Sequence, residues 1–136
     1  NYACSMAITN GCDVELTDGT TEHFALTAED QINIATAEKA VQAGASAFPY
    51  HADGKLCRLY PAADIQKIIN TATMWKTYHT TYFNHLKQWI NRMEDKAEIQ
   101  NVRYGVELPD DLKASLDGIM SAMQQMLDAG VSLTMA

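Results

Sequence analysis

The chain has 136 residues, of which 47% are hydrophobic and 20% are charged, and its net charge is −7. This size and apolar content predict a single domain, spanning 1–136, with a core of its own. The acidic balance argues against nucleic acids and anionic membrane surfaces as partners, because both select clustered Lys and Arg. No apolar run reaches the roughly 18 residues that a membrane span needs, and no signal-peptide pattern is visible.

The first residues, 1–10, resemble the end of a helix that Asn10-Gly11 closes, since glycine often follows the last helical turn. We therefore expect the C-terminal part of a longer polypeptide. The three cysteines, Cys4, Cys12 and Cys57, are odd in number and widely spaced, which does not describe a disulfide framework or a zinc site. They predict reduced thiols in a cytosolic product.

Residues 14–26 predict a β-hairpin around Asp18-Gly19. A two-residue loop would divide the apolar side chains between the two faces. A three-residue loop from Thr17 to Gly19, with Gly19 left-handed, gathers them on one face. Because the buried face sets the register, we expect the longer loop, with this apolar set inside: Val14, Leu16, Phe24 and Leu26.

A helix should follow, capped by Thr27 and ending near Ala43, before Gly44. Residues 48–60 then predict a second hairpin around Asp53-Gly54, where a two-residue loop suffices. That loop places Phe48, Tyr50, Cys57 and Leu59 on one face, with His51 and Arg58 on the other. The recurrence could be a weak ββα repeat, although two such units also arise by chance.

The dominant pattern is an apolar seam on one long helix, 62–93, which Pro61 starts from its first turn. The seam alternates spacings of three and four: Ile65, Ile68, Ala72, Trp75, His79, Tyr82, Leu86, Trp89 and Met93. Tyr78, Phe83 and Ile90 widen it. A stripe this broad predicts self-association as a dimer or trimer, unless the hairpins cover it. The residues that we assign to a core seam or interface are Trp75, His79, Tyr82, Phe83, Leu86 and Trp89.

Asp95 should cap a short helix with Ile99 and Val102, and Tyr104-Gly105 should form a turn. Pro109 opens a last helix, which ends at Gly130 before a tail, 131–136. Its apolar face comprises Leu112, Leu116, Ile119, Met120, Met123 and Leu127. The expected fold is α+β: one or two short hairpins packed on a small helical bundle, with the 62–93 helix at its centre.

No catalytic, cofactor or metal motif is evident. His79 and His85 lie about 120° apart around one helix, unlike a metal-binding pair one turn apart. The expected register separates His51 from Cys57, and nothing local activates that thiol. Asp18-Gly19 and Asp53-Gly54 lack the acidic ligands of calcium loops. We expect no enzyme, with a small enzyme using Cys57, His51 or His79 as the less favoured alternative.

Four runs together resemble a known family: 22–33 (EHFALTAEDQIN), 49–58 (PYHADGKLCR), 78–86 (YHTTYFNHL) and 104–109 (YGVELP). The family comprises proteins of unknown function from phage and prophage tail gene regions of gut Firmicutes. A looser resemblance is to a C-terminal domain of unknown function in phage tail-fibre and tail-associated proteins. The resemblance covers roughly 3–112 and carries no catalytic residues.

The resemblance implies a structural or accessory module of a phage tail that acts by protein–protein contact. Its partners would be other tail proteins and copies of itself, with no nucleic acid and no membrane. It would be found in the host bacterial cytoplasm during assembly and on the virion tail. A chaperone for tail-fibre assembly is the alternative within the same setting.

Overall fold

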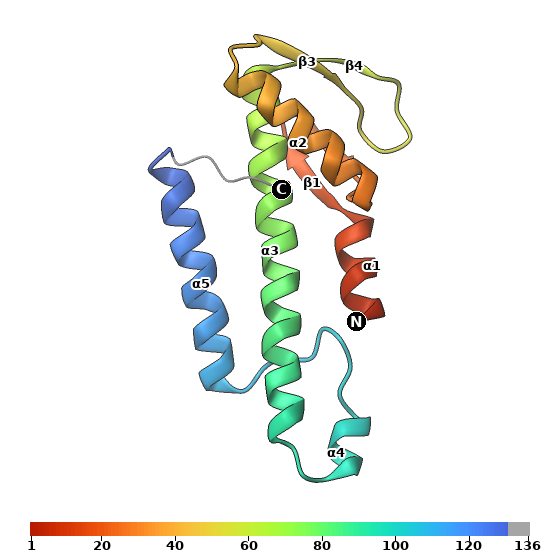
Figure 1. Cartoon of the computed structure of the whole chain (residues 1–136), viewed down its shortest axis with the longest axis vertical. Helices are drawn as coiled ribbons and strands as arrows, with labels where there is room; N and C mark the ends of the chain where they lie inside the picture. The colour runs from red at the N-terminus through yellow and green to blue at the C-terminus, as the bar shows by residue number, and fades with distance from the viewer. Residues whose placement is uncertain (131–136) are drawn as a thin grey trace.

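The computed structural model describes residues 1–130 and has the expected α+β architecture. One long helix, α3 (Ala62–Arg92), runs through the molecule and carries the other elements along its sides (Figure 1). The other helices are α1 (Tyr2–Asn10), α2 (Ala28–Gln42), α4 (Lys96–Gln100) and α5 (Asp110–Asp128). Two antiparallel hairpins are formed by β1 (Cys12–Glu15) with β2 (Thr21–Phe24) and by β3 (Ala47–Tyr50) with β4 (Arg58–Pro61).

The first hairpin has the loop that the sequence predicted. The N–H of Leu16 donates to the carbonyl of Thr20 at 2.8 Å, so the loop comprises the three residues from Thr17 to Gly19. Gly19 has a φ of +86°, the left-handed conformation that this loop requires. The predicted inner set is buried, each side chain at most 2% exposed: Val14, Leu16, Phe24 and Leu26.

The predicted register of the second hairpin is wrong by one residue. Tyr50 pairs with Arg58, and Phe48 pairs with Tyr60. Asp53-Gly54 does form a turn, closed by the Lys55 N–H on the Ala52 carbonyl at 3.0 Å. The turn does not join the strands directly, because three residues separate Gly54 from β4 and only two separate β3 from Asp53.

This shift exchanges the two faces of β4, as any one-residue slip does. Tyr60 is buried in the core, and Arg58 lies on the same face of β4 with an exposed side chain, whereas Cys57 is exposed and Leu59 is 66% exposed. The gain is a buried aromatic group: Tyr50 and Tyr60 each lie 6.0 Å, centroid to centroid, from Phe24 of the other hairpin. On β4 the shift places Tyr60, 1% exposed, in the core in place of Cys57 and Leu59, while Tyr50 lies on the inner face in either register.

The ends of the helices largely match the expected signals. Thr27 caps α2 in a reciprocal pair with Asp30, and Asp95 caps α4 through the Ala97 N–H at 2.8 Å. Pro61 lies one position earlier than expected, at the N-cap of α3. Gly105 and Gly130 take positive φ at the turn and after α5. The predicted tail, 131–136, lies outside the described residues.

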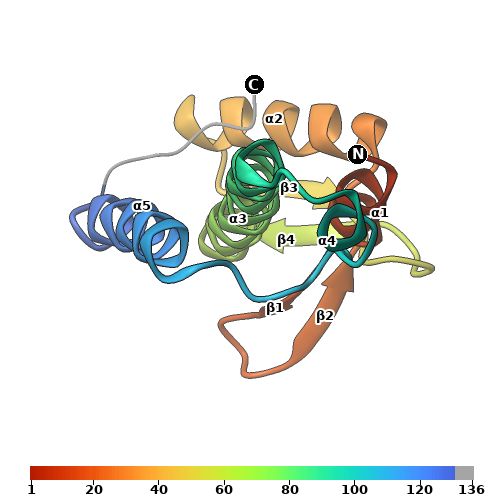
Figure 2. The ribbon, with the colours of Figure 1, turned by 90° about the horizontal axis from the view of Figure 1, so that it is seen from below.

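Two hydrophobic cores lie along α3. The upper one joins both hairpins and α2 to the first half of α3, and its α3 members are Ile65, Ile68, Ile69 and Ala72. The lower one joins the second half of α3 to α5 and to the segment before it: Tyr82, Leu86, Leu108, Leu112 and Leu116. Viewed along α3, α2 and the β1–β2 hairpin lie on opposite sides of the β3–β4 hairpin (Figure 2).

Within residues 1–130, no helix is long and apolar enough to cross a membrane.

Candidate functional site

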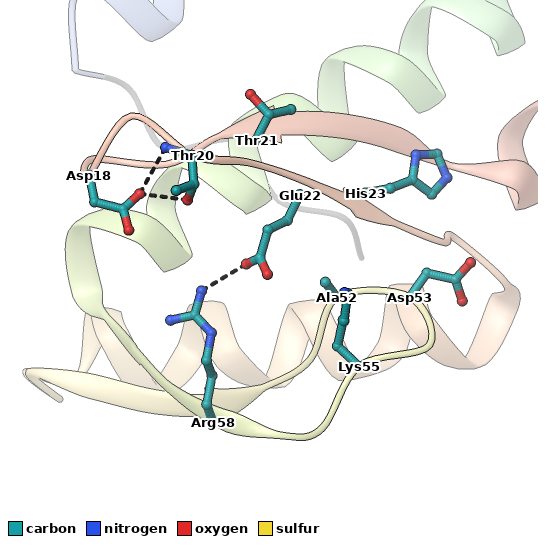
Figure 3. Close-up of a pocket in the computed structure, with 9 residues that line it drawn as sticks. All are labelled: Asp18, Thr20, Thr21, Glu22, His23, Ala52, Asp53, Lys55 and Arg58. Atoms are coloured by element: carbon teal, nitrogen blue, oxygen red, sulfur yellow. Dashed lines mark hydrogen bonds and ion pairs between the residues drawn. The ribbon is translucent and has the colours of Figure 1, made fainter.

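A polar groove of about 540 Å³ separates the two hairpins (Figure 3). One wall is β2 with the end of the loop before it, and the opposite wall is the β3–β4 loop with the start of β4. The lining residues are Asp18, Thr20, Thr21, Glu22, His23, Ala52, Asp53, Lys55 and Arg58. Charges of both signs therefore face one another across the groove.

An ion pair joins the two walls. An Arg58 nitrogen lies 2.7 Å from Glu22 Oε1, and the same oxygen accepts a bond of 2.8 Å from the Tyr60 hydroxyl. The Arg58 guanidinium also lies 3.9 Å from the centroid of the Tyr60 ring. The bond with Glu22 raises the pKa of Arg58, and burial, followed by the bond with Glu22, raises the pKa of Tyr60. The pair therefore links β4 to β2 across the groove.

Asp18 and Lys55 add further charges to the lining of the groove. Asp18 accepts bonds from the Thr20 N–H at 3.0 Å and the Thr20 hydroxyl at 2.6 Å, and these bonds lower the pKa of Asp18. On the opposite wall, Lys55 makes no hydrogen bond or ion pair with any side chain of residues 1–130. Lys55 is thus a cation without a counter-ion beside the groove.

His23 lies where the two walls meet. Its Nδ1 is 2.7 Å from Asp13 Oδ1, and its Nε2 is 2.5 Å from the Asn10 carbonyl. The bond to Asp13, followed by that to Asn10, raises the pKa of His23. The backbone N–H of Asp53 donates to the His23 carbonyl at 2.8 Å. The second hairpin is therefore bonded to the edge of the first at this end.

The side chains assigned to the seam lie against α1, α5 and the segment between α4 and α5. Trp75 is half-buried, and its Nε1 donates to the Ala7 carbonyl at 3.0 Å. Tyr82 is buried; its hydroxyl donates to the Val106 carbonyl and accepts from the Gly105 N–H at 3.1 Å. Leu86 is 4% exposed in the lower core, whereas Phe83 and Trp89 are half-buried. These residues hold the fold together.

His79 occupies an aromatic cage on this seam. Its Nδ1 lies 2.8 Å from the Tyr104 hydroxyl, while its Nε2 is buried with no partner among residues 1–130. Trp75 and Tyr78 pack edge-on against its ring at 4.5 Å and 5.2 Å between centroids. Burial lowers the pKa of His79, because the cage offers no compensating anion.

The other candidate catalytic residues do not converge. His85 is buried between α3 and α5, with Nε2 2.8 Å from Ser115 Oγ. His51 lies beside its neighbour's carbonyl, at 3.2 Å from Ala52 O, and Cys57 is exposed in the β3–β4 loop. His79 lies roughly 25 Å along α3 from its first residue, given 1.5 Å per residue. Thus Cys57, His51 and His79 form no nucleophile–base pair.

The groove was not predicted from the sequence, because its charged residues carry no spacing signal. One clue exists in the four runs of the family resemblance. Runs 22–33 and 49–58 together supply Glu22, His23, Asp53, Lys55 and Arg58 to the groove. Runs 78–86 and 104–109 meet at the bonds of Tyr82 and His79. The runs therefore come together in pairs.

Among residues 1–130, no group of three or more His, Cys, Asp or Glu side chains is arranged to hold a metal ion. No family model matches the chain, and neither the curated proteins nor the solved structures include a significant match to it.

Proposed function

We propose that this chain is a non-enzymatic module of a phage tail, structural or accessory, that acts by contact with other tail proteins. The observation that carries the proposal is the groove, to which two of the four family-like runs contribute. Its lining offers hydrogen-bond donors and acceptors of both charges, which suits a polypeptide ligand. The protein would be present in the host cytoplasm during assembly and on the virion tail.

Exposed apolar side chains on the β3–β4 hairpin support a contact surface. Leu56 in the β3–β4 loop is 91% exposed, and Leu59 of β4 is 66% exposed. Leu56 lies two residues before Arg58, and Leu59 follows Arg58 and points to the opposite face of β4. Protein interfaces commonly combine apolar anchors with a polar surround. Neither leucine contributes to either hydrophobic core of the described chain.

The runner-up is a chaperone that helps a tail fibre fold or attach. Purified virions distinguish the two roles. We expect antibodies against the full chain to detect it in virions at a stoichiometry that survives washing in high salt. Detection in infected cells together with absence from virions would favour the chaperone and contradict the tail module.

An enzyme built on Cys57 is the less favoured alternative, and thiol labelling tests it. Cys57 will label faster than Cys4 and Cys12 simply because those two are buried. The informative comparison is therefore Cys57 in the folded chain against Cys57 in the chain unfolded in urea. We expect equal rates for an exposed thiol without activation. Faster labelling in the folded state would indicate an activated nucleophile.

Self-association is also part of the proposal, but the α3 seam on which it rested leaves less exposed apolar surface than the sequence predicted. Most of the α3 seam is covered by α1, the hairpins, α5 and the segment before α5. The apolar side chains left at the surface include Tyr78, 39% exposed, and Ile119 and Met126 on one side of α5, 40% and 39% exposed. Sedimentation equilibrium at micromolar concentration should show species above 15.0 kDa. A single species at that mass would contradict self-association.

A further inference from the structure

Strand β2 has a free edge that faces the groove. In an antiparallel pair, successive residues direct their backbone groups alternately toward the partner strand and away from it. The Leu16 N–H donates to the Thr20 carbonyl, so Leu16 and Thr20 form a hydrogen-bonded pair. Two residues along each strand, Val14 and Glu22 form the next such pair. The N–H and carbonyl groups of Thr21 and His23 therefore point away from β1.

The outer edge of β1 is not equivalent. It lies against α3, where the Lys67 ammonium donates to the Glu15 carbonyl at 3.3 Å. By contrast, three successive residues of β2, 21–23, and Thr20 just before them line the groove. Because side chains alternate along a strand, a cavity lined by successive residues runs along the strand's edge. The β2 edge is thus the open one of the two.

The molecule already uses part of this edge. The His23 carbonyl accepts the Asp53 N–H at 2.8 Å, so a backbone from the β3–β4 loop lies beside β2 at its far end. The remaining edge groups are the N–H and carbonyl of Thr21 and the N–H of His23. They face the open part of the groove, where Figure 3 shows Glu22 and Arg58 reaching toward each other from the two walls.

We propose that an extended segment of a partner polypeptide binds in this groove as a third strand beside β2. Its backbone bonds to Thr21, and the β3–β4 loop forms the opposite wall. Edge addition of this kind draws affinity from main-chain hydrogen bonds and specificity from alternate side chains. This inference rests on the proposed function, because it names the kind of tail-protein segment that the groove receives.

The charges of the groove specify the segment further. The residue paired with Thr21 directs its side chain outward, and its two neighbours point toward the face that carries Glu22. On that side, Arg58 retains N–H donors beyond the one bound to Glu22, and Lys55 has no ion-pair partner among residues 1–130. Asp18 and Asp53 line the groove as well. The best segment therefore carries one acidic residue, at one of the two positions next to the residue paired with Thr21, and none at its ends.

A library of random linear peptides displayed on the surface of an unrelated carrier provides the probe, with the full chain as bait. Enriched peptides are synthesised, and their dissociation constants are measured with the wild type and two variants. Thr21→Pro removes the edge N–H, which β1 does not use, so the hairpin should persist. Thr21→Val keeps this N–H and changes the side chain alone. We expect Thr21→Pro to weaken binding about tenfold or more and Thr21→Val to leave it unchanged.

Amide hydrogen exchange of the wild type, with and without peptide, covers the case in which Thr21→Pro fails to fold. The Thr21 and His23 amides should gain protection from exchange when the peptide binds. In a separate test, Lys55→Glu should weaken the binding of the acidic peptides. Failure to enrich any peptide, equal binding by Thr21→Pro, or unprotected Thr21 and His23 amides would overturn the inference. So would a dimer that Thr21→Pro abolishes, because the edge would then pair with itself.

The two proposals fail separately. A chain that remains on virions but selects no peptide contradicts edge addition and leaves the tail module standing. A chain that selects edge-binding peptides but is absent from virions contradicts the tail module, and edge addition then stands as a property of the groove.

Discussion

The backbone N–H of Thr17 donates a hydrogen bond of 2.8 Å to the carboxylate of Asp64. Thr17 begins the loop of the first hairpin, and Asp64, which is 5% exposed, lies in the first turn of α3. The bond therefore attaches the β1–β2 hairpin to the start of the long helix. A carboxylate at this helix end also interacts favourably with the positive end of the helix dipole.

Replacing Asp64 with Ala should lower the free energy of unfolding by about 1–3 kcal/mol, because the Thr17 N–H would lose its acceptor in a partly buried place. Asp64→Asn should cost less, since the amide oxygen still accepts the bond. Urea denaturation measures both, with the exposed Asp117→Ala as control. Equal losses for Ala and Asn would show that the Thr17 bond contributes little.

Leu86 tests the lower core. It is 4% exposed among residues of α3, α5 and the segment before α5. Leu86→Ala should lower the free energy of unfolding by about 2–5 kcal/mol, the usual loss for a large-to-small core change. Leu56→Ala is the matched control, because it makes the same chemical change at a side chain that is 91% exposed. Thermal shifts of similar size for the two variants would refute burial of the seam.

The long helix was predictable because its signal is repeated many times. Each buried position of α3 adds to one periodic pattern, and an error at a single residue does not move the helix. The half-buried state of Trp75 shows the limit of the pattern. Periodicity assigns a face, but it does not say how far α1 extends over that face.

The second hairpin was less predictable because its register depends on one residue. Asp53-Gly54 correctly indicated the turn, yet the loop has one more residue on its β4 side. What distinguishes the observed register is the packing of Tyr60 against Phe24 of the first hairpin, because Tyr50 lies on the inner face in either register. That contact joins segments far apart in the sequence, which local turn rules do not include.

The groove follows from the same long-range contact. Only in the observed register does Arg58 share a face of β4 with Tyr60, where its side chain, 47% exposed, meets Glu22 across the groove at 2.7 Å. The predicted register placed Arg58 on the outer face, so the ion pair between the hairpins was hidden from sequence reasoning. The candidate site was missed for the reason that the register was missed.

Gly11 is required where α1 meets the end of β2. It has a φ of +81°, and a Cβ atom at this position would lie 1.9 Å from the Phe24 carbonyl oxygen. Gly44 is also left-handed, with a φ of +104°, but a Cβ atom there would meet no atom within 4 Å. A substitution at Gly44 therefore introduces backbone strain alone, whereas one at Gly11 introduces both backbone strain and a steric clash.

Gly44→Ala should cost about 1–2 kcal/mol, the strain of a left-handed L-residue. Gly11→Ala should add about 1–3 kcal/mol of overpacking to this strain, because Phe24 is held by the β1–β2 ladder. Chemical denaturation of both variants gives the difference. If Gly11→Ala is no less stable than Gly44→Ala, the α1–β2 junction adjusts more freely than the structure indicates.

His79 makes stability depend on pH. Its pKa is lowered in the folded chain by burial, and its Nε2 has no partner among residues 1–130 to stabilise a charged ring. Its ring packs against Trp75, Tyr78 and Tyr104, and no carboxylate of residues 1–130 forms an ion pair with it. Below the ordinary histidine pKa of about 6.5, the unfolded chain therefore binds a proton that the folded chain resists.

Stability should accordingly fall as pH drops from about 6.5 toward the lowered pKa of His79, by at most about 1.4 kcal/mol per pH unit for one proton. His79→Gln should remove this loss, so the wild type minus His79→Gln difference should shrink with acidification. His23 is the control of opposite sign. Its pKa is raised by Asp13 and Asn10, so its contribution is complete below about 6.5 and is lost as pH rises through the raised value. Urea denaturation of wild type, His79→Gln and His23→Gln between about pH 5.5 and 7.5 separates the two. If the difference in unfolding free energy between wild type and His79→Gln does not change with pH, burial in the cage does not disfavour protonation of His79.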